Sequence, residues 1–246
     1  MAGPASAGRS PAAERRALTI PPLGAPGDGG PTLDAVLELP AEGAAPRGCV
    51  VVCHPHPLYG GDRESSVVRA IADGALAVGL AALRFDFRGV GASTGAYDEG
   101  RGERDDARAA LAAAAAQPEI DAPRIALAGY SFGGSVAAGV VADATAAGEA
   151  APPALALVAA PLPPAEEVRA ALVGYAGPLL LAAGEHDNFS APEAMAALAA
   201  ERAKAAAEGG AVTETLTAPG TDHFWLGSER LLAERAGAFF AGALGG

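Results

Sequence analysis

Two serines lie in the pattern Gly-x-Ser-x-Gly, which is typical of the nucleophile of serine hydrolases. Ser131 lies in GYSFG at residues 129–133, and Ser93 lies in GASTG at residues 91–95. A serine hydroxyl is a weak nucleophile at its ordinary pKa, so it needs a neighbouring base to remove its proton. The elements around each serine must therefore decide which of them reacts.

Ser131 has the local setting that a nucleophile requires. An apolar run at residues 124–129 predicts a buried strand that leads into the motif, and the pattern at 132–147 predicts a helix directly after it. A serine on such a sharp turn is raised above the sheet and lies at the positive end of a helix. Ser93 follows a strand that ends near Phe87 and lies in a glycine-rich loop, so we interpret its motif as a turn.

The acid and the base are expected further along the chain, in the order serine, acid, histidine. Asp187 follows an apolar run at residues 178–183, and His223 follows an alternating run at 211–218. The carboxyl ends of parallel strands meet at one edge of a sheet, so these side chains should meet there. We predict that His223 takes the proton of Ser131 and that Asp187 orients the imidazole.

Other carboxylates and histidines near these positions allow different assignments. Glu185 is closer to its strand than Asp187 is, and Asp222 is adjacent to the histidine in the chain, where it is badly placed to face the ring. The sequence HPH at residues 54–56 could also bind zinc, with His186 or Asp187 as a third ligand. Flanking prolines and a serine triad explain the same residues more simply, so we predict no metal and no cofactor.

The elements that must position these residues form an alternating series. Strands are predicted at residues 32–40, 48–55, 80–89, 124–129, 154–161, 178–187 and 211–220. Helices are predicted at residues 66–79, 103–117, 132–147, 164–174, 191–210 and 228–244. This order predicts an α/β fold with a mostly parallel central sheet of about eight strands and helices on both faces. We expect a disordered segment at residues 1–14 and a single domain at 15–246, in which the alternating run 32–40 is an exposed strand.

Composition and charge exclude several kinds of partner. The chain of 246 residues has 17 Lys and Arg against 29 Asp and Glu, and its formal net charge is -12. Nucleic acids and anionic membranes bind clustered cations, so we expect neither as a partner. The chain shows no secretory signal and no convincing membrane span, and Cys49 and Cys53 lie about 13 Å apart if they share a strand, too far for a disulfide. We expect a cytoplasmic protein with free, buried thiols, and we leave its oligomeric state open, a homodimer included.

Taken together, these motifs resemble those of the α/β-hydrolase superfamily. The chain is most similar to a small, lidless bacterial branch that is related to carboxylesterases and dienelactone hydrolases. The resemblance covers the chain from about residue 30 onward. It rests on HPHPLYGG (54–61), RFDFRGVGAS (84–93), GYSFGG (129–134), GEHD (184–187) and DHFW (222–225).

The resemblance implies an oxyanion hole formed by two backbone N–H groups. One is the amide of Phe132, which follows the nucleophile. The other comes from the loop after residues 48–55, where relatives often have glycine and this chain has Pro55, which has no N–H. We predict that the second donor is His56, with Leu58 or Tyr59 as alternatives.

The resemblance also implies a serine hydrolase without a sizeable cap domain. Larger relatives insert a lid after the strand at 154–161, but here only residues 162–177 precede the next strand. The loops around the site must then form its rim, and we expect Leu58, Tyr59 and Tyr97 to bind the substrate in a shallow pocket. We predict hydrolysis of small carboxylic esters or thioesters through an acyl-enzyme on Ser131. The alternatives are an acyltransferase or peptidase with the same triad, or a ligand binder without catalytic activity.

Overall fold

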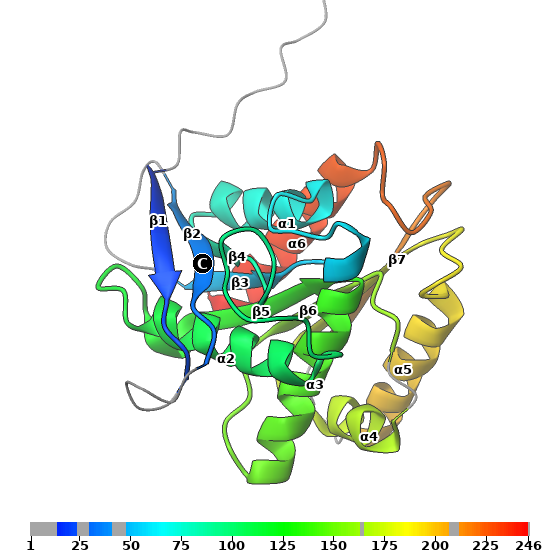
Figure 1. Ribbon diagram of the computed structural model, residues 1–246. Coiled ribbons are helices and arrows are strands. Elements are labelled where there is room, and N and C mark those ends of the chain that lie inside the picture. The colour runs from blue at the N-terminus through cyan, green and yellow to red at the C-terminus, as the bar shows by residue number, and fades with distance from the viewer. Residues whose placement is uncertain (1–13, 24–29, 41–47, 163–164, 207–211, 246) are drawn as a thin grey trace, which may run out of the picture.

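The central feature of the protein is one eight-stranded sheet. The computed structural model describes residues 14–23, 30–40, 48–162, 165–206 and 212–245. The strand order is β1-β2-β4-β3-β5-β6-β7-β8 (Figure 1). The strands are β1 (Glu14–Ile20), β2 (Leu33–Leu39), β3 (Cys49–Cys53), β4 (Ala81–Phe85), β5 (Ile125–Tyr130), β6 (Leu155–Val158), β7 (Leu179–Gly184) and β8 (Thr213–Ala218).

The sheet is mostly parallel, as predicted. Only the pairs of β2 with β1 and of β2 with β4 are antiparallel, and the neighbours from β4 to β8 run parallel. The sequence did not predict β1. The expectation that residues 32–40 form an exposed strand is wrong, because β1 pairs with β2 along its whole length. The segment 1–14, expected to be disordered, lies outside the described residues except for Glu14, which begins β1.

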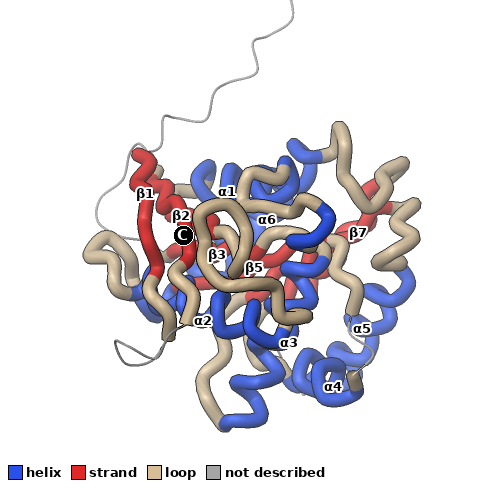
Figure 2. The backbone as a smooth tube through the Cα atoms, viewed as in Figure 1, coloured by secondary structure: helices blue, strands red, loops and turns tan. Residues whose placement is uncertain are grey.

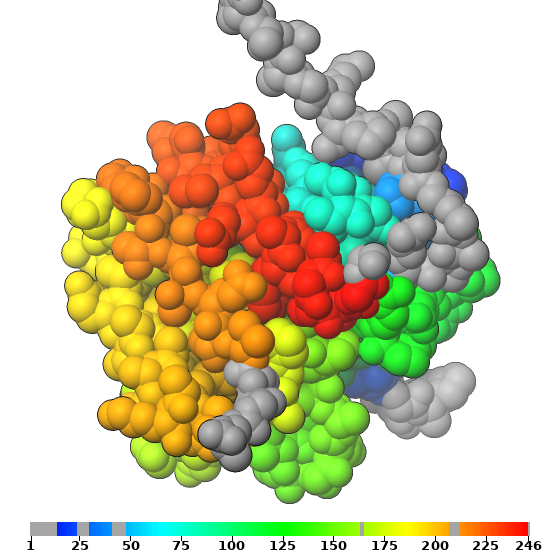
Figure 3. Space-filling view, turned by 180° about the vertical axis from the view of Figure 1, so that it is seen from behind, coloured from blue at the N-terminus to red at the C-terminus, as the bar shows by residue number. Residues whose placement is uncertain are grey.

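Helices cover both faces of the sheet. They are α1 (Ser66–Ala77), α2 (Arg101–Ala115), α3 (Phe132–Ala147), α4 (Glu166–Gly174), α5 (Pro192–Ala205) and α6 (Glu229–Leu244), with short 3₁₀ turns η1 (Pro57–Tyr59) and η2 (Ala122–Arg124). Helices α1 and α6 lie together on one face, and α2 to α5 lie on the other (Figures 1 and 3). Two glycines let α1 and α6 approach closely, because a Cβ on Gly74 would lie 2.3 Å from the carbonyl oxygen of Ala233, and one on Gly237 would lie 2.5 Å from that of Gly74.

The core consists of two layers, one on each face of the sheet. Successive side chains of a strand point to opposite faces, so a strand buried on both sides must be apolar throughout. In β3, Val50 and Val52 pack toward α1 and α6, while Cys49, Val51 and Cys53 belong to the opposite layer. Both cysteines are free and buried, as expected, and burial raises the pKa of both thiols.

The connection between β6 and β7 is short. The described residues between β6 and β7 contain α4 and no further helix, so they add no lid (Figure 2). The loops that follow β3, β5, β7 and β8 begin at the same edge of the sheet, because these strands are parallel. Among the described residues, no helix combines the length and the apolar character needed to cross a membrane.

Candidate active site

Ser131 lies on a strained turn between β5 and α3. Its backbone has φ +53° and ψ −121°, a conformation that costs a residue other than glycine about 1–3 kcal/mol. The two glycines of the motif allow the turn to pack closely. A Cβ on Gly129 would lie 2.2 Å from the carbonyl oxygen of Gly133, and a Cβ on Gly133 would lie 2.4 Å from that of Cys53. The motif therefore presses the turn against β3 and leaves the Ser131 hydroxyl at the carboxyl edge of the sheet.

A continuous chain of contacts links Ser131 to His223 and Asp187. Ser131 Oγ lies 2.9 Å from His223 Nε2, and His223 Nδ1 lies 3.0 Å from each carboxylate oxygen of Asp187. A carboxylate can only accept, so Nδ1 carries the proton and Nε2 is free to accept from the serine. Asp187 is buried, and its Oδ1 also accepts from the amides of Phe189 and Ser190. The structure thus brings together the three residues that the sequence selected.

The alternative acids have other contacts. Glu185 Oε2 accepts from the amide of Gly220 at 2.7 Å, and Asp222 Oδ1 accepts from the amide of Phe224 at 2.9 Å. Each carboxylate therefore fixes a loop. The side chain of His186 is 66% exposed, and the described residues contain no group of three His, Cys, Asp or Glu side chains that could hold a metal ion.

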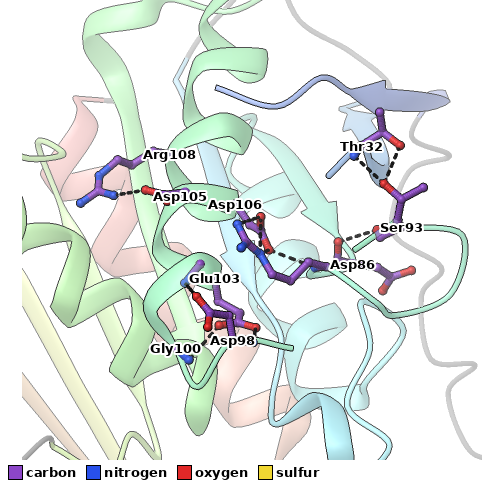
Figure 4. Close-up of polar contacts among 12 residues, drawn as sticks. Thr32, Asp86, Ser93, Asp98, Gly100, Glu103, Asp105, Asp106 and Arg108 are labelled. Atoms are coloured by element: carbon purple, nitrogen blue, oxygen red, sulfur yellow. Dashed lines mark hydrogen bonds and ion pairs between the residues drawn. The ribbon is translucent and has the colours of Figure 1, made fainter. Parts of the chain in front are cut away.

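Ser93 lies where the loop after β4 crosses the beginning of β2 (Figure 4). Its Oγ donates to the carbonyl oxygen of Asp86 at 2.7 Å and accepts from the amide of Asp34 at 2.9 Å. Next to it, Thr94 Oγ1 accepts from the amide of Thr32 at 2.8 Å. Backbone groups thus occupy both the donor and the acceptor function of the Ser93 hydroxyl, which agrees with its interpretation as a turn residue.

Two amides beside Ser131 are available for an oxyanion. Within the described part of the chain, the N–H groups of Phe132 and His56 donate to no protein acceptor. The alternative donors are occupied, since the Leu58 amide donates to His56 Nδ1 at 3.2 Å and the Tyr59 amide donates to the His56 carbonyl oxygen at 3.1 Å. This pattern favours His56 over Leu58 and Tyr59.

His54 holds the beginning of the loop after β3, which carries His56, against the residues that follow β4. Its Nε2 accepts from the amide of Phe87 at 2.9 Å, and its Nδ1–H donates to the carbonyl oxygen of Pro55 at 2.6 Å. The ring is fully buried, and this burial lowers the pKa of His54 to about 4. Sequence reasoning considered His54 only as part of a motif and missed this positioning role, although a histidine directly after a buried strand is a signal for it.

We expect the neutral state of His54 to make stability depend on pH. Because the unfolded chain binds a proton near pH 6.5 and the folded one only near pH 4, the free energy of unfolding should fall as pH drops through this window. The loss should reach about 2 kcal/mol at pH 5 relative to pH 8. Urea unfolding at both pH values would measure it in the wild type and in His54→Gln, whose amide oxygen can still accept from Phe87.

The raised pKa values of Asp86 and Asp106, which follow from burial, act in the opposite direction but are common to both proteins. The difference between wild type and variant therefore isolates the histidine. Equal pH dependence in the two proteins would contradict a buried, neutral His54.

A cavity of about 920 Å³ opens beside the Ser131 hydroxyl. None of the described residues that line it is Asp, Glu, Lys or Arg. Its apolar walls are formed mainly by Val67, Phe132, Pro161, Phe189, Phe224 and Leu226. The cavity is thus larger than the shallow pocket that the sequence predicted, and it is suited to uncharged groups.

Of the three residues expected to bind the substrate, Tyr59 lines the cavity, and Leu58 and Tyr97 are not among its lining residues. The Tyr97 hydroxyl instead lies 3.2 Å from His56 Nε2, and its ring packs on that imidazole. The carboxylate of Glu103 holds the Tyr97 loop by accepting from two of its amides (Figure 4). Tyr97 therefore supports the His56 side chain and does not line the cavity.

Sequence reasoning did not select Phe189, Phe224 or Leu226. Phe189 comes two residues after Asp187, Phe224 follows His223 directly, and Leu226 comes three residues after His223. Their position beside the proposed acid and base is a signal that could have found them. Their orientation could not be predicted, because it depends on how the two loops turn.

The sheet order, the turn at Ser131 and the short connection between β6 and β7 define an α/β hydrolase without a lid. The model of the X-Pro dipeptidyl-peptidase (S15) family matches residues 28–229, and the chain belongs to this family. An α/β serine hydrolase homologue from Coxiella burnetii superposes with a TM-score of 0.72 at 29% identity, over 91% of this chain and 96% of that one. A lidless α/β serine hydrolase from Xanthomonas campestris gives a TM-score of 0.72 at 28% identity, over 95% and 96% of the two chains.

A curated relative is an uncharacterized protein of Rickettsia prowazekii. It is 48% identical over 61 residues, which are 25% of this chain and 26% of that protein. The chain therefore spans about a quarter of the length of this relative, and the match carries no information about substrate.

Proposed function

We propose that the protein hydrolyses carboxylic esters or thioesters through an acyl-enzyme on Ser131. The observation that carries this proposal is the series of contacts from Ser131 Oγ to His223 Nε2 at 2.9 Å and from His223 Nδ1 to Asp187 at 3.0 Å. Two amides that donate to no acceptor among the described residues accompany these contacts: that of Phe132 on the same turn and that of His56 on the loop after β3, and both residues line the cavity with Ser131. This combination is what acyl transfer needs.

In the proposed reaction, His223 takes the proton of Ser131 as Oγ attacks the acyl carbon. The carbonyl oxygen becomes negatively charged and accepts hydrogen bonds from the amides of Phe132 and His56. His223 then gives the proton to the leaving group, which departs. Water attacks the acyl-enzyme with His223 again as base, and the carboxylic acid and free Ser131 result.

A peptidase is the second candidate, because the family to which the chain belongs is described as X-Pro dipeptidyl-peptidases. Release of a dipeptide requires a site that holds the free α-ammonium group of the substrate. A carboxylate is the partner that such a cation prefers, and the described lining of the cavity contains none. The uncharged cavity therefore favours neutral acyl substrates.

We expect Ala-Pro-p-nitroanilide to react no faster than its N-acetylated form, and both to react more slowly than p-nitrophenyl butyrate. A carboxylate that held the ammonium group would favour the free amine by roughly 10–100-fold. Comparison of kcat/KM for the three compounds tests this. A preference of tenfold or more for the free amine would support the peptidase instead.

A further inference from the structure

Two phenylalanines flank the imidazole of His223 and are exposed to solvent. The ring centroid of Phe189 lies 4.8 Å from that of His223, and the ring centroid of Phe224 lies 5.6 Å from it. Their residues are 67% and 63% exposed, and both line the cavity. They come from the loops after β7 and β8, which lie side by side, because the amide of His186 donates to the carbonyl oxygen of Thr221 at 2.8 Å (Figure 1).

The backbone that carries Phe189 is fixed by hydrogen bonds. The Phe189 amide donates to Asp187 Oδ1 at 2.9 Å, and the next residue, Ser190, is buried and donates its hydroxyl to the carbonyl oxygen of Ala160 at 2.7 Å. The proposed acid thus holds the same turn that presents Phe189. The exposure of this ring is therefore a property of an ordered turn.

The loop that carries Phe224 is fixed in a similar way. Its amide donates to Asp222 Oδ1 at 2.9 Å, and the hydroxyls of Thr221 and Ser228 lie 2.7 Å apart. Trp225 is fully buried and has φ +60°, an uncommon conformation for this residue type. Burial of the indole anchors the loop in the core, while Phe224 before it remains at the mouth of the cavity.

Exposed apolar side chains gather at this mouth. The described residues include seven large hydrophobic side chains that are exposed, and four of them line the cavity: Tyr59, Phe189, Phe224 and Leu226. Contiguous exposed apolar surface of this kind marks a binding site. Its continuity with Ser131 and His223 indicates that the ligand is part of the substrate.

The chemistry of the base determines which part of the substrate lies here. When the tetrahedral intermediate collapses, the bond between the acyl carbon and the ester oxygen breaks, and that oxygen takes the proton from His223 Nε2. The leaving group must therefore lie beside the imidazole, whereas the carbonyl oxygen lies against the amides of Phe132 and His56. Phe189 and Phe224 are the side chains that flank the imidazole on the solvent side.

We propose that Phe189 and Phe224 form a subsite for the leaving group and select esters of apolar alcohols. This inference rests on the proposed function and specifies its substrate class. Ester and water give carboxylic acid and alcohol, so no oxidant or co-substrate is required. Each methylene that the two rings cover by half should raise kcat/KM about twofold.

The experiment uses acetate esters of ethanol, butanol and hexanol, whose alcohols have nearly equal acidity. Wild-type kcat/KM should rise roughly 16-fold from the ethyl to the hexyl ester, which adds four methylenes. In the double variant Phe189→Ala/Phe224→Ala, kcat/KM for the hexyl ester should exceed that for the ethyl ester by about threefold or less. The variants Phe189→Leu and Phe224→Leu, which keep apolar surface, should show an intermediate rise.

Three controls make the result specific. A second series, from ethyl acetate to ethyl hexanoate, varies the acyl group. Across this series kcat/KM should depend on chain length equally in the wild type and the double variant. Val212→Ala removes an apolar side chain of 60% exposure directly before β8, at the end of that strand opposite to the loop of Phe224, and should retain the full wild-type rise. Labelling of Ser131 by a small fluorophosphonate should persist in every variant, which reports an intact site.

An unchanged rise in the double variant, or an equal loss in both ester series, would overturn the subsite. A dimer in the wild type that dissociates in the double variant would also overturn it, because the patch would then be an interface between two copies. Absence of ester turnover and of fluorophosphonate labelling in the folded wild type would instead reject the proposed function itself.

Discussion

Replacement of Ser131 by alanine is expected to lower kcat for ester hydrolysis by about 10⁵–10⁶-fold. The substitution removes the attacking oxygen and leaves His223 without the group that it deprotonates. Alanine replaces another residue with a Cβ at φ +53°, so the backbone strain is unchanged and the variant should fold normally. Single-turnover and steady-state rates with p-nitrophenyl butyrate would measure the loss.

Ser93→Ala is the matched control, because Ser93 lies in the same sequence pattern. Its hydroxyl bonds the backbone of Asp86 and Asp34, so the variant should lose about 1–3 kcal/mol of stability and keep a kcat near that of the wild type. Substantial turnover by Ser131→Ala, or a folded but inactive Ser93→Ala, would reverse the assignment of the two serines.

Replacement of Asp187 by asparagine is expected to lower kcat by about 10⁴-fold. The asparagine oxygen can still accept from the amides of Phe189 and Ser190, so the turn should persist. Its NH₂ group, however, would donate to His223 Nδ1 and move the imidazole proton to Nε2. In that tautomer His223 cannot accept the proton of Ser131. The kcat for an activated ester, together with a thermal unfolding curve, would test this.

Asp222→Asn provides the corresponding control. Asp222 is adjacent to His223 in the chain, and its Oδ1 accepts from the Phe224 amide, a bond that asparagine can retain. We expect this variant to stay within about threefold of wild-type kcat, since it alters no contact of the imidazole ring. A larger loss for Asp222→Asn than for Asp187→Asn would identify Asp222 as the acid.

The sequence predicted the parts of the protein in which local pattern and position in the sheet agree. Each of the seven predicted strands corresponds to one of β2 to β8, and α3 begins and ends at the predicted residues. The order of Ser131, Asp187 and His223 along the chain, each after a strand, was enough to predict that they meet. Parallel strands place their carboxyl ends at one edge, so three local predictions gave one long-range contact.

Strand β1 was missed because its sequence, ERRALTI, begins with three charged residues and follows a segment rich in Ala, Gly and Pro. All of its described residues except Ile20 are exposed or half-buried, and its main stabilising contact is the pairing with β2, which a local pattern does not reveal. The strand propensity of a sequence predicts little where pairing with another strand determines whether a strand forms.

The cavity walls were also not predictable in detail. Leu58 and Tyr59 are neighbours in one 3₁₀ turn, yet only Tyr59 lines the cavity. Which side of the turn faces Ser131 depends on the carbonyl oxygen of His56, which accepts from the amides of both Tyr59 and Gly61. Loop geometry of this kind follows from hydrogen bonds between residues, and composition does not encode it.

The most direct test of the account is the site of covalent modification by a fluorophosphonate probe. The probe reacts only with a serine that a neighbouring base activates. The account predicts one labelled peptide in the wild type, modified at Ser131 and containing the sequence GYSFGG, and no label in Ser131→Ala. Modification at Ser93, or a folded wild-type protein that takes up no probe, would contradict the assignment of Ser131 as the nucleophile.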